Sequence, residues 1–370
     1  MIVCFPHQLI CICQLTGYLF QYGGLIMYKE EFSFPSSEEG ETIRGRIYLP
    51  YSRVHGVVQF AHGMCDYGSR YEDFFKVLTD CGYAAAYADH LGHGLSVQNL
   101  DDLGYFSAKQ GYLKVVDDFS RFYDIVDEEI HSEKHYVWGH SMGSFVVRYF
   151  MATCRKNMAG AVLMGTSGPN PLAGVGAGIA ELLALTKGGY HRSEFISKLA
   201  FGTYNRKIED PRSPWAWLSR DDDAVDSFSS DKFRNRTFTA AGFRDMFSMV
   251  RYVNRHSFLE NTPKELPVLL LSGEEDPLGN YGKGILRLED MFRSAGMEDV
   301  ETVLFPEARH ELCHELNREE VYKTFIHWLD EHEKTDIRLT FAEDPFDFDD
   351  EYEDEYDDEY DDDDEEREYE

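Results

Sequence analysis

A Gly-x-Ser-x-Gly turn joins a strand pattern to a helix pattern near the middle of the chain. The turn is Gly139-His140-Ser141-Met142-Gly143, and the short β-prone run 136–138 precedes it. After the turn, apolar residues recur at helical spacing over 145–150. A serine at such a strand-to-helix bend needs glycines two positions to either side, because larger side chains would collide. This feature predicts a sheet whose strands lead directly into helices.

The turn also predicts a chemistry. The helix that begins at Ser141 would direct its free N–H groups and positive dipole end toward an attacked carbonyl oxygen. A Gly-x-Ser-x-Gly sequence also occurs as an ordinary glycine-rich turn with a serine helix cap. The strand before it and the helix after it favour a nucleophilic Ser141 and acyl transfer.

Alternating strand and helix patterns predict an α/β fold with a mostly parallel sheet. Two further runs, around 28–34 and 43–48, flank the polar turn 36–40 and predict an antiparallel hairpin at the sheet edge. The other expected strands are 56–61, 83–89, 136–138, 161–165, 267–272 and 301–305, and the expected helices include 71–81, 117–130 and 283–294.

Two later loops supply partners for a nucleophilic serine. Glu274, Glu275 and Asp276 follow the strand 267–272, and a carboxylate there could orient a catalytic histidine. Asp276 is favoured because Pro277 fixes the turn after it. His310 follows the strand 301–305 on a loop, and it is preferred to the alternative His314, which is expected near the start of the last helix.

The loop after the strand 56–61 predicts part of an oxyanion hole. It reads His62-Gly63-Met64, and the backbone N–H groups of Met64 and Met142 are the expected donors to the oxyanion. On its own, His62-Gly63 is more often a simple β-turn. His90 and His93 lie in a glycine-rich turn, and we interpret them as supporting rather than catalytic residues.

Between the two halves of the sheet pattern, residues 170–255 contain helical stretches but no strong strand. This composition predicts a helical cap, with an α/β core formed by 27–169 and 256–335. The aromatic and methionine side chains of the cap either line an apolar pocket or pack its interior, and packing is the default for each. The helical stretches are expected at 179–185 and 195–200.

Both ends of the chain differ from this core. Residues 1–26 lack lysine and arginine, and Gly23-Gly24 could reflect a ribosome-binding site upstream of a start at Met27. We therefore expect 1–26 to be a non-native extension without a fold of its own, with a membrane span over 9–27 as the weaker alternative. Residues 336–370 are expected to be a disordered acidic tail, since 343–370 hold 20 acids and one arginine of a chain whose net charge is −32.

Composition narrows the remaining possibilities. The seven cysteines form no C-x-x-C pair, which predicts reduced thiols, a cytoplasmic protein and no structural zinc. No basic patch accompanies exposed aromatic residues, so nucleic-acid binding is not expected. The oligomeric state is not readable from the sequence.

Taken together, five ordered motifs resemble those of the monoacylglycerol lipase and lysophospholipase branch of the α/β-hydrolases. The resemblance covers about 28–332, and the order Ser141, Asp276, His310 is the one expected for α/β-hydrolases. It implies a serine hydrolase of lipid-like carboxylic esters, with a mobile cap, no metal, no cofactor and transient contact with membrane surfaces. Two alternatives stay open: a peptidase or amidase with the same triad, and a non-catalytic binding protein of this fold. A peptidase would need an acid in the cap for a substrate amine, and the candidates are Glu181, Glu194, Asp221 and Asp222. The motifs are His62-Gly63-Met64, Asp89-His90-Leu91-Gly92-His93-Gly94-Leu95-Ser96, Gly139-His140-Ser141-Met142-Gly143, Gly273-Glu274-Glu275-Asp276-Pro277 and Ala308-Arg309-His310-Glu311.

Overall fold

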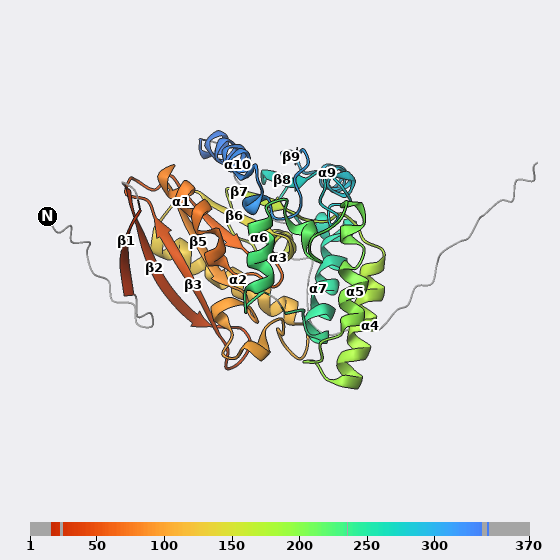
Figure 1. Cartoon of the computed structure of the whole chain (residues 1–370). Helices are drawn as coiled ribbons and strands as arrows, with labels where there is room; N and C mark the ends of the chain where they lie inside the picture. The colour runs from red at the N-terminus through yellow and green to blue at the C-terminus, as the bar shows by residue number, and fades with distance from the viewer. Residues whose placement is uncertain (1–15, 23–24, 235, 335–338, 340–370) are drawn as a thin grey trace, which may run out of the picture.

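The structure is a computed structural model that describes residues 16–22, 25–234, 236–334 and 339. Within these residues one sheet has the strand order β1-β2-β3-β5-β4-β6-β7-β8-β9. Strands β4 to β9 are parallel to one another, whereas β1, β2 and β3 form an antiparallel extension beside β5 (Figure 1). The strands are β1 Thr16–Tyr22, β2 Leu25–Pro35, β3 Thr42–Leu49, β4 Gly56–Ala61, β5 Tyr83–Asp89, β6 His135–His140, β7 Gly160–Met164, β8 Val268–Gly273 and β9 Val300–Phe305.

Helices cover both faces of the sheet, and the strands are therefore apolar on both sides. Val57 and Val137 pack in a core cluster with α2, α3 and α9, whereas the adjacent Val58 and Tyr136 pack in a second cluster with α1 and α10. This alternation follows from the two-residue repeat of a strand. The helices are α1 Glu72–Asp80, α2 Gly111–Ile130, α3 Met142–Thr153, α4 Leu172–Lys187, α5 Glu194–Phe201, α6 Asp222–Ser230, α7 Ala240–Val253, α8 His256–Leu259, α9 Lys283–Ser294 and α10 Arg318–Glu333.

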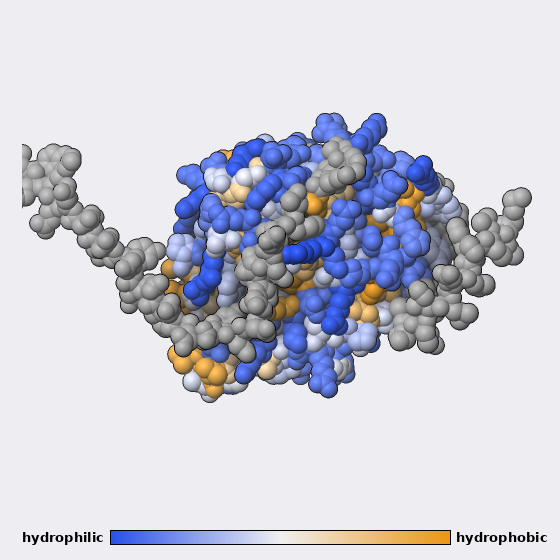
Figure 2. Space-filling model, turned by 180° about the vertical axis from the view of Figure 1, so that it is seen from behind, coloured by the Kyte–Doolittle hydropathy of each residue, from blue (hydrophilic) through white to orange (hydrophobic). Residues whose placement is uncertain are grey.

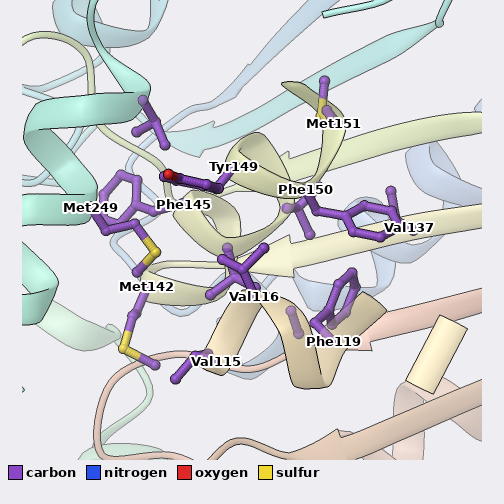
Figure 3. Close-up of a cluster of buried hydrophobic side chains, with 14 of the residues drawn as sticks. Val115, Val116, Phe119, Val137, Met142, Phe145, Tyr149, Phe150, Met151 and Met249 are labelled. Carbon is purple, nitrogen blue, oxygen red and sulfur yellow. The ribbon is translucent and has the colours of Figure 1, made fainter. Parts of the chain in front are cut away.

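Helix α3, which follows the Gly-x-Ser-x-Gly turn, is buried between the sheet and its neighbouring helices. All but one of its residues are buried. Figure 3 shows its side chains packed against those of α2 on one side and of α7 on the other. The first turn of α3 is thereby fixed relative to both the sheet and the inserted helices. The labelled side chains are Val115, Val116 and Phe119 of α2, Val137 of β6, Met142, Phe145, Tyr149, Phe150 and Met151 of α3, and Met249 of α7.

The predicted pattern of strands and helices is confirmed, but two helices begin earlier than expected: α2, and α4, which begins at Leu172 rather than at 179. The hairpin is present as β2 and β3, which pair in antiparallel register from Tyr28 with Leu49 to Pro35 with Thr42. Helix α2 begins at Gly111, six residues before the expected 117. Its first turns already carry Tyr112 and Val115 toward the core, so burial extends the helix toward its N-terminus.

The expectation that residues 1–26 have no fold is wrong for one segment. Residues 16–22 form β1, which pairs with β2 along its whole length. The outer edge of β2 offers unpaired N–H and C=O groups, and a neighbouring extended segment satisfies them by adding a strand. Whether translation begins at Met27 stays a prediction. Residues 1–15, 23–24 and 340–370, with most of the expected acidic tail, lie outside the described residues.

None of the described helices is both long and apolar enough to cross a membrane.

The inserted segment is helical, as expected. Between β7 and β8 the described residues form α4 to α8 and short 3₁₀ turns but no strand. In Figure 1, α4, α5 and α7 gather on the side of the molecule opposite β1. Arg148 in α3 joins the core to this segment, because its guanidinium donates to the carbonyl groups of Ser167 and of Val253 at the end of α7. The boundaries 170 and 255 of the cap stay a proposal.

Candidate active site

The backbone at Ser141 has the strained geometry that the turn predicts. Ser141 has φ 53° and ψ −119°, which a serine adopts only when its surroundings enforce it. A Cβ atom at Gly139 would lie 2.3 Å from the Gly143 carbonyl oxygen, and one at Gly143 would lie 2.0 Å from the Ala61 carbonyl oxygen. Both glycines are therefore required for the close approach of α3 to β4 and β6, and this interpretation of the motif is confirmed.

The three predicted triad residues form one hydrogen-bonded chain. Ser141 follows β6, Asp276 follows β8 and His310 follows β9, so all three lie at the carboxyl end of the parallel strands. His310 Nε2 is 2.9 Å from Ser141 Oγ, and His310 Nδ1 is 2.9 Å from Asp276 Oδ2. Because a carboxylate can only accept, Nδ1 carries the proton and Nε2 is free to accept from the serine hydroxyl.

The surroundings of His310 favour its protonated form. Burial by itself would lower the pKa of this imidazole, but the facing Asp276 carboxylate outweighs burial, and the pKa is raised above its ordinary 6.5. Of the three acids that compete in sequence, Asp276 is the one whose carboxylate meets His310. Glu275 instead pairs with Arg309 at 3.5 Å.

The alternative histidine, His314, lies in a different environment. It is part of a 3₁₀ turn before α10 rather than in the helix itself. Its ring faces the Glu311 carboxylate and the Arg70 carbonyl. Burial lowers the pKa of His314 to about 4, so its imidazole is neutral at physiological pH.

The His62-Gly63-Met64 loop packs directly on the serine. A Cβ atom at Gly63 would lie 3.2 Å from Ser141 Cβ, so a larger residue would press on the nucleophile. The buried His62 ring holds the loop: Nδ1 lies 2.9 Å from the Gly63 carbonyl oxygen, and Nε2 accepts from the His90 backbone N–H. Among the described residues, no backbone acceptor takes the N–H of Met64 or Met142.

His90 and His93 are buried beside this loop and make no hydrogen bond to the triad. Their rings lie 4.2 Å and 5.1 Å from the ring of His62, centroid to centroid. Burial lowers the pKa of both, that of His93 to about 3, so both are neutral. They do not line the cavity described below, which agrees with a supporting role.

A cavity of about 280 Å³ opens above Ser141 and His310, between the core and the inserted helices. Its walls are mainly apolar, and most of the lining residues come from the inserted segment between β7 and β8, which includes α4, α5 and α7. Trp217 packs its ring 5.0 Å from that of His310. Apolar lining residues include Met64, Met142, Phe145, Leu172, Val175, Ile179, Phe195, Leu199, Trp215, Trp217, Met246, Phe247 and Val250.

The sequence did not predict a group of buried charged residues, of which Asp66, Arg234 and Glu311 line this cavity. Asp66, Arg70, Arg234 and Glu311 form a buried ion-pair network next to the triad. Glu311 is the last residue of one predicted motif and Asp66 lies two residues after another, which is a weak signal. Their arginine partners lie up to 241 positions away, as Arg70 does from Glu311, so only the folded chain shows the pairing.

No group of three or more His, Cys, Asp or Glu side chains within the described residues is arranged to hold a metal ion.

Comparison with known proteins places this fold and site in a family. The profile of the family described as "Serine aminopeptidase, S33" matches residues 52–317. A monoacylglycerol lipase of Mycolicibacterium smegmatis is 24% identical over 290 residues, which cover 77% of this chain and 92% of the relative.

Solved structures agree with this placement. A thermostable carboxyl esterase from Bacillus coagulans, in complex with glycerol, superposes with a TM-score of 0.78 and 27% identity, over 82% of this chain and 99% of that one. A soluble variant of a monoglyceride lipase from Saccharomyces cerevisiae has the same fold, with a TM-score of 0.62 and 18% identity over 89% of this chain and 99% of the other. The chain therefore belongs to the serine aminopeptidase S33 family, and it is an α/β-hydrolase of the monoacylglycerol lipase-like type.

Proposed function

We propose that this protein is a serine hydrolase that cleaves lipid-like carboxylic esters through an acyl-enzyme. Its relatives support a carboxylic ester hydrolase, since one is named a monoacylglycerol lipase and another a carboxyl esterase. The observation that carries the proposal is the hydrogen-bonded chain of Ser141, His310 and Asp276, because Ser141 and His310 also line a mainly apolar cavity.

The mechanism follows from this geometry. His310 Nε2 takes the proton of Ser141 Oγ as that oxygen attacks the ester carbonyl, and Asp276 stabilises the resulting imidazolium. The N–H groups of Met64 and Met142 bind the oxyanion. His310 then gives the proton to the departing alcohol. In the second half of the reaction, His310 takes a proton from a water molecule as the water attacks the acyl-enzyme. It then returns that proton to Ser141 Oγ as the acid is released.

The cavity supports an apolar acyl chain as the larger part of the substrate. Helices α4, α5 and α7 surround the space with Leu172, Ile179, Phe195 and Phe247. Each buried CH₂ group of an acyl chain gains about 0.8 kcal/mol, so such a wall selects for aliphatic substrates. Monoacylglycerols and lysophospholipids are the two substrate classes that we propose to test.

The peptidase alternative lacks a carboxylate for a substrate amine. Glu181, Glu194, Asp221 and Asp222 are all among the described residues, and none lines the cavity. The two acids that do line it, Asp66 and Glu311, are already paired with buried arginines. An incoming ammonium group would have to displace a guanidinium, which favours ester over aminopeptidase substrates despite the name of the family.

The outer face of the inserted helices supports transient contact with a lipid surface. Figure 2 shows apolar residues gathered at one edge of a largely hydrophilic face, over the end of α4. Leu172 and Val175 of α4 and Phe195 and Leu199 of α5 are exposed and also line the cavity, so exposed apolar surface of the inserted helices reaches the site. An apolar patch that leads into an apolar cavity is suited to take a substrate from a lipid surface. We retain 170–255 as the cap and a cytoplasmic location as parts of the proposal.

The test is a substrate panel measured with the wild-type protein and Ser141→Ala. We expect hydrolysis of monoacylglycerols or lysophospholipids, little hydrolysis of aminoacyl amides, and loss of about 10⁴-fold or more in the variant. Preferred cleavage of aminoacyl amides would support the peptidase alternative. No Ser141-dependent turnover of any ester or amide would support a binding protein.

A further inference from the structure

Four charged side chains form a closed network beside the triad: Asp66, Arg70, Arg234 and Glu311. Each side chain is at most 9% exposed. Arg70 donates to Asp66 at 2.8 Å and to Glu311 at 2.9 Å. Arg234 donates to Glu311 from Nη2, and its Nε lies 3.6 Å from Asp66. Two cations and two anions thus balance one another away from water.

The network joins three segments that the reaction requires. Asp66 lies two residues after Met64, whose N–H is a proposed oxyanion donor. Glu311 directly follows His310. Arg234 comes from the inserted segment, in the loop between α6 and α7. A shift of Arg234 would therefore be transmitted to both the oxyanion loop and the histidine loop.

Arg234 is held firmly by its own segment. Its guanidinium lies 4.0 Å from the centre of the Phe228 ring in α6, and its backbone N–H donates to Asp231. Its Nε also approaches the Cys65 carbonyl oxygen at 3.4 Å. The inserted segment contacts the histidine loop independently, since the Glu311 backbone N–H donates to the Leu218 carbonyl at 2.7 Å.

The charges of the network also act on His310. Burial would raise the pKa of the Asp66 and Glu311 carboxyls, but the guanidinium groups overcome it, so both carboxylates stay ionised. Both carboxylates raise the pKa of His310. Loss of the Arg234 charge would leave the network with a net negative charge, which stabilises the imidazolium further. The charged and titratable groups that face His310 are Asp276 from the loop after β8, Glu311 from its own loop, Asp66 from the loop after β4 and the neutral His140 from β6. Those that face Glu311 are Arg70, Arg234 and His314.

We propose that Arg234 is a positioning residue of the inserted segment, which sets His310 through Glu311 and the Met64 N–H through the Cys65–Asp66 backbone. The inserted segment then completes the catalytic machinery as well as binding substrate. This inference rests on the proposed function.

The test compares Arg234→Met with Arg244→Met on a short, soluble ester. Arg244 is a matched control, because it is a largely buried arginine of α7 that donates to the carbonyls of Ser107 and Ala108 in the core but lies outside the network. For Arg234→Met we expect kcat to fall about 10- to 100-fold, with KM changed less than about threefold. The acid limb of the kcat/KM profile should move up by about 0.5–1 pH unit, since the pKa of His310 rises. Arg244→Met should leave that limb in place.

Two more variants keep the test decisive if Arg234→Met folds poorly. Arg234→Lys retains the positive charge but not the planar guanidinium that contacts both acids. We therefore expect the acid limb of its kcat/KM profile at the wild-type pH, with a reduced kcat. The double variant Arg234→Met with Glu311→Gln restores charge balance and should return the limb toward its wild-type position. A wild-type kcat in Arg234→Lys, or an acid limb that Arg234→Met leaves unmoved, would overturn the inference. Absence of ester hydrolysis and of fluorophosphonate labelling in the wild-type protein would instead reject the proposed function.

Discussion

Replacement of Asp276 by asparagine tests the role of the acid with almost no change in shape. The carboxylate is fully buried, with Oδ2 2.9 Å from His310 Nδ1 and Oδ1 accepting from the Leu278 N–H at 2.8 Å. An asparagine oxygen can keep the bond to Leu278. Its NH₂ group would then face Nδ1 and donate to it, so the imidazole proton would move to Nε2. A protonated Nε2 can no longer accept a hydrogen bond from Ser141.

The expected loss is the combined cost of the wrong tautomer and of an unpaired imidazolium. An asparagine at the acid position of a Ser-His-Asp triad lowers kcat by about 10⁴-fold. At 1.36 kcal/mol per tenfold, this is a loss of about 5.4 kcal/mol of transition-state stabilisation. Asp276 contributes most to raising the pKa of His310 against burial, so the pKa should fall in the variant. The acid limb of the residual activity should therefore move to lower pH.

The assay is kcat/KM against pH for wild type, Asp276→Asn and the control Glu275→Gln, together with thermal unfolding. The Glu275 side chain is half exposed and pairs with Arg309 rather than with His310, so its variant should retain nearly full turnover. Unfolding midpoints of all three should agree within a few degrees. Turnover of Asp276→Asn within about tenfold of wild type would refute the reasoning and transfer the role to Glu274 or Glu275.

The remaining predictions concern the alternative histidine, the turn and the two ends of the chain. His310→Ala should remove most activity, whereas His314→Ala should change it only a few-fold, as steady-state kinetics would show; the reverse order would exchange their roles. Gly143→Ala should prevent stable folding, because its Cβ would lie 2.0 Å from the Ala61 carbonyl oxygen, and a wild-type unfolding midpoint would contradict this. A chain that ends at Thr340 should hydrolyse a small ester normally but bind anionic vesicles more strongly at low salt. The reason is that the 20 acids of 343–370 repel such surfaces within a Debye length of about 8 Å at physiological salt. Equal vesicle binding by both chains would leave the acidic tail with only a solubilising role. If translation begins at Met27, mass spectrometry of the native protein should find no peptide from 9–24.

The sequence was sufficient to locate the hydrogen-bonded triad because each member follows a strong local pattern. Ser141 and Asp276 each follow a strongly apolar run that reads as a buried strand, and His310 follows the strand pattern 301–305. Parallel strands bring their carboxyl ends to one edge, so the order of motifs along the chain predicts their proximity. The choice of Asp276 over two adjacent glutamates depended on a turn residue, and the structure confirms its contact with His310.

The charged network could not be predicted in the same way. The pairing of Arg234 with Glu311 spans 77 positions and depends on how the inserted segment docks on the core. No periodicity encodes that docking, because the segment carries apolar residues both for packing and for the cavity wall. The strand β1 was missed for a related reason: pairing to an open sheet edge depends on backbone groups, to which the side-chain pattern of 16–22 gives little guide.

The central claim is that Ser141 is the nucleophile of an acyl-transfer site. Its most direct test is to treat the protein with a fluorophosphonate and to locate the adduct by peptide mass spectrometry, with Ser141→Ala and heat-denatured protein alongside. The account predicts one adduct per chain, on the peptide that contains Ser141, absent from both controls. An adduct on another residue, or none on the folded wild-type protein, would contradict it.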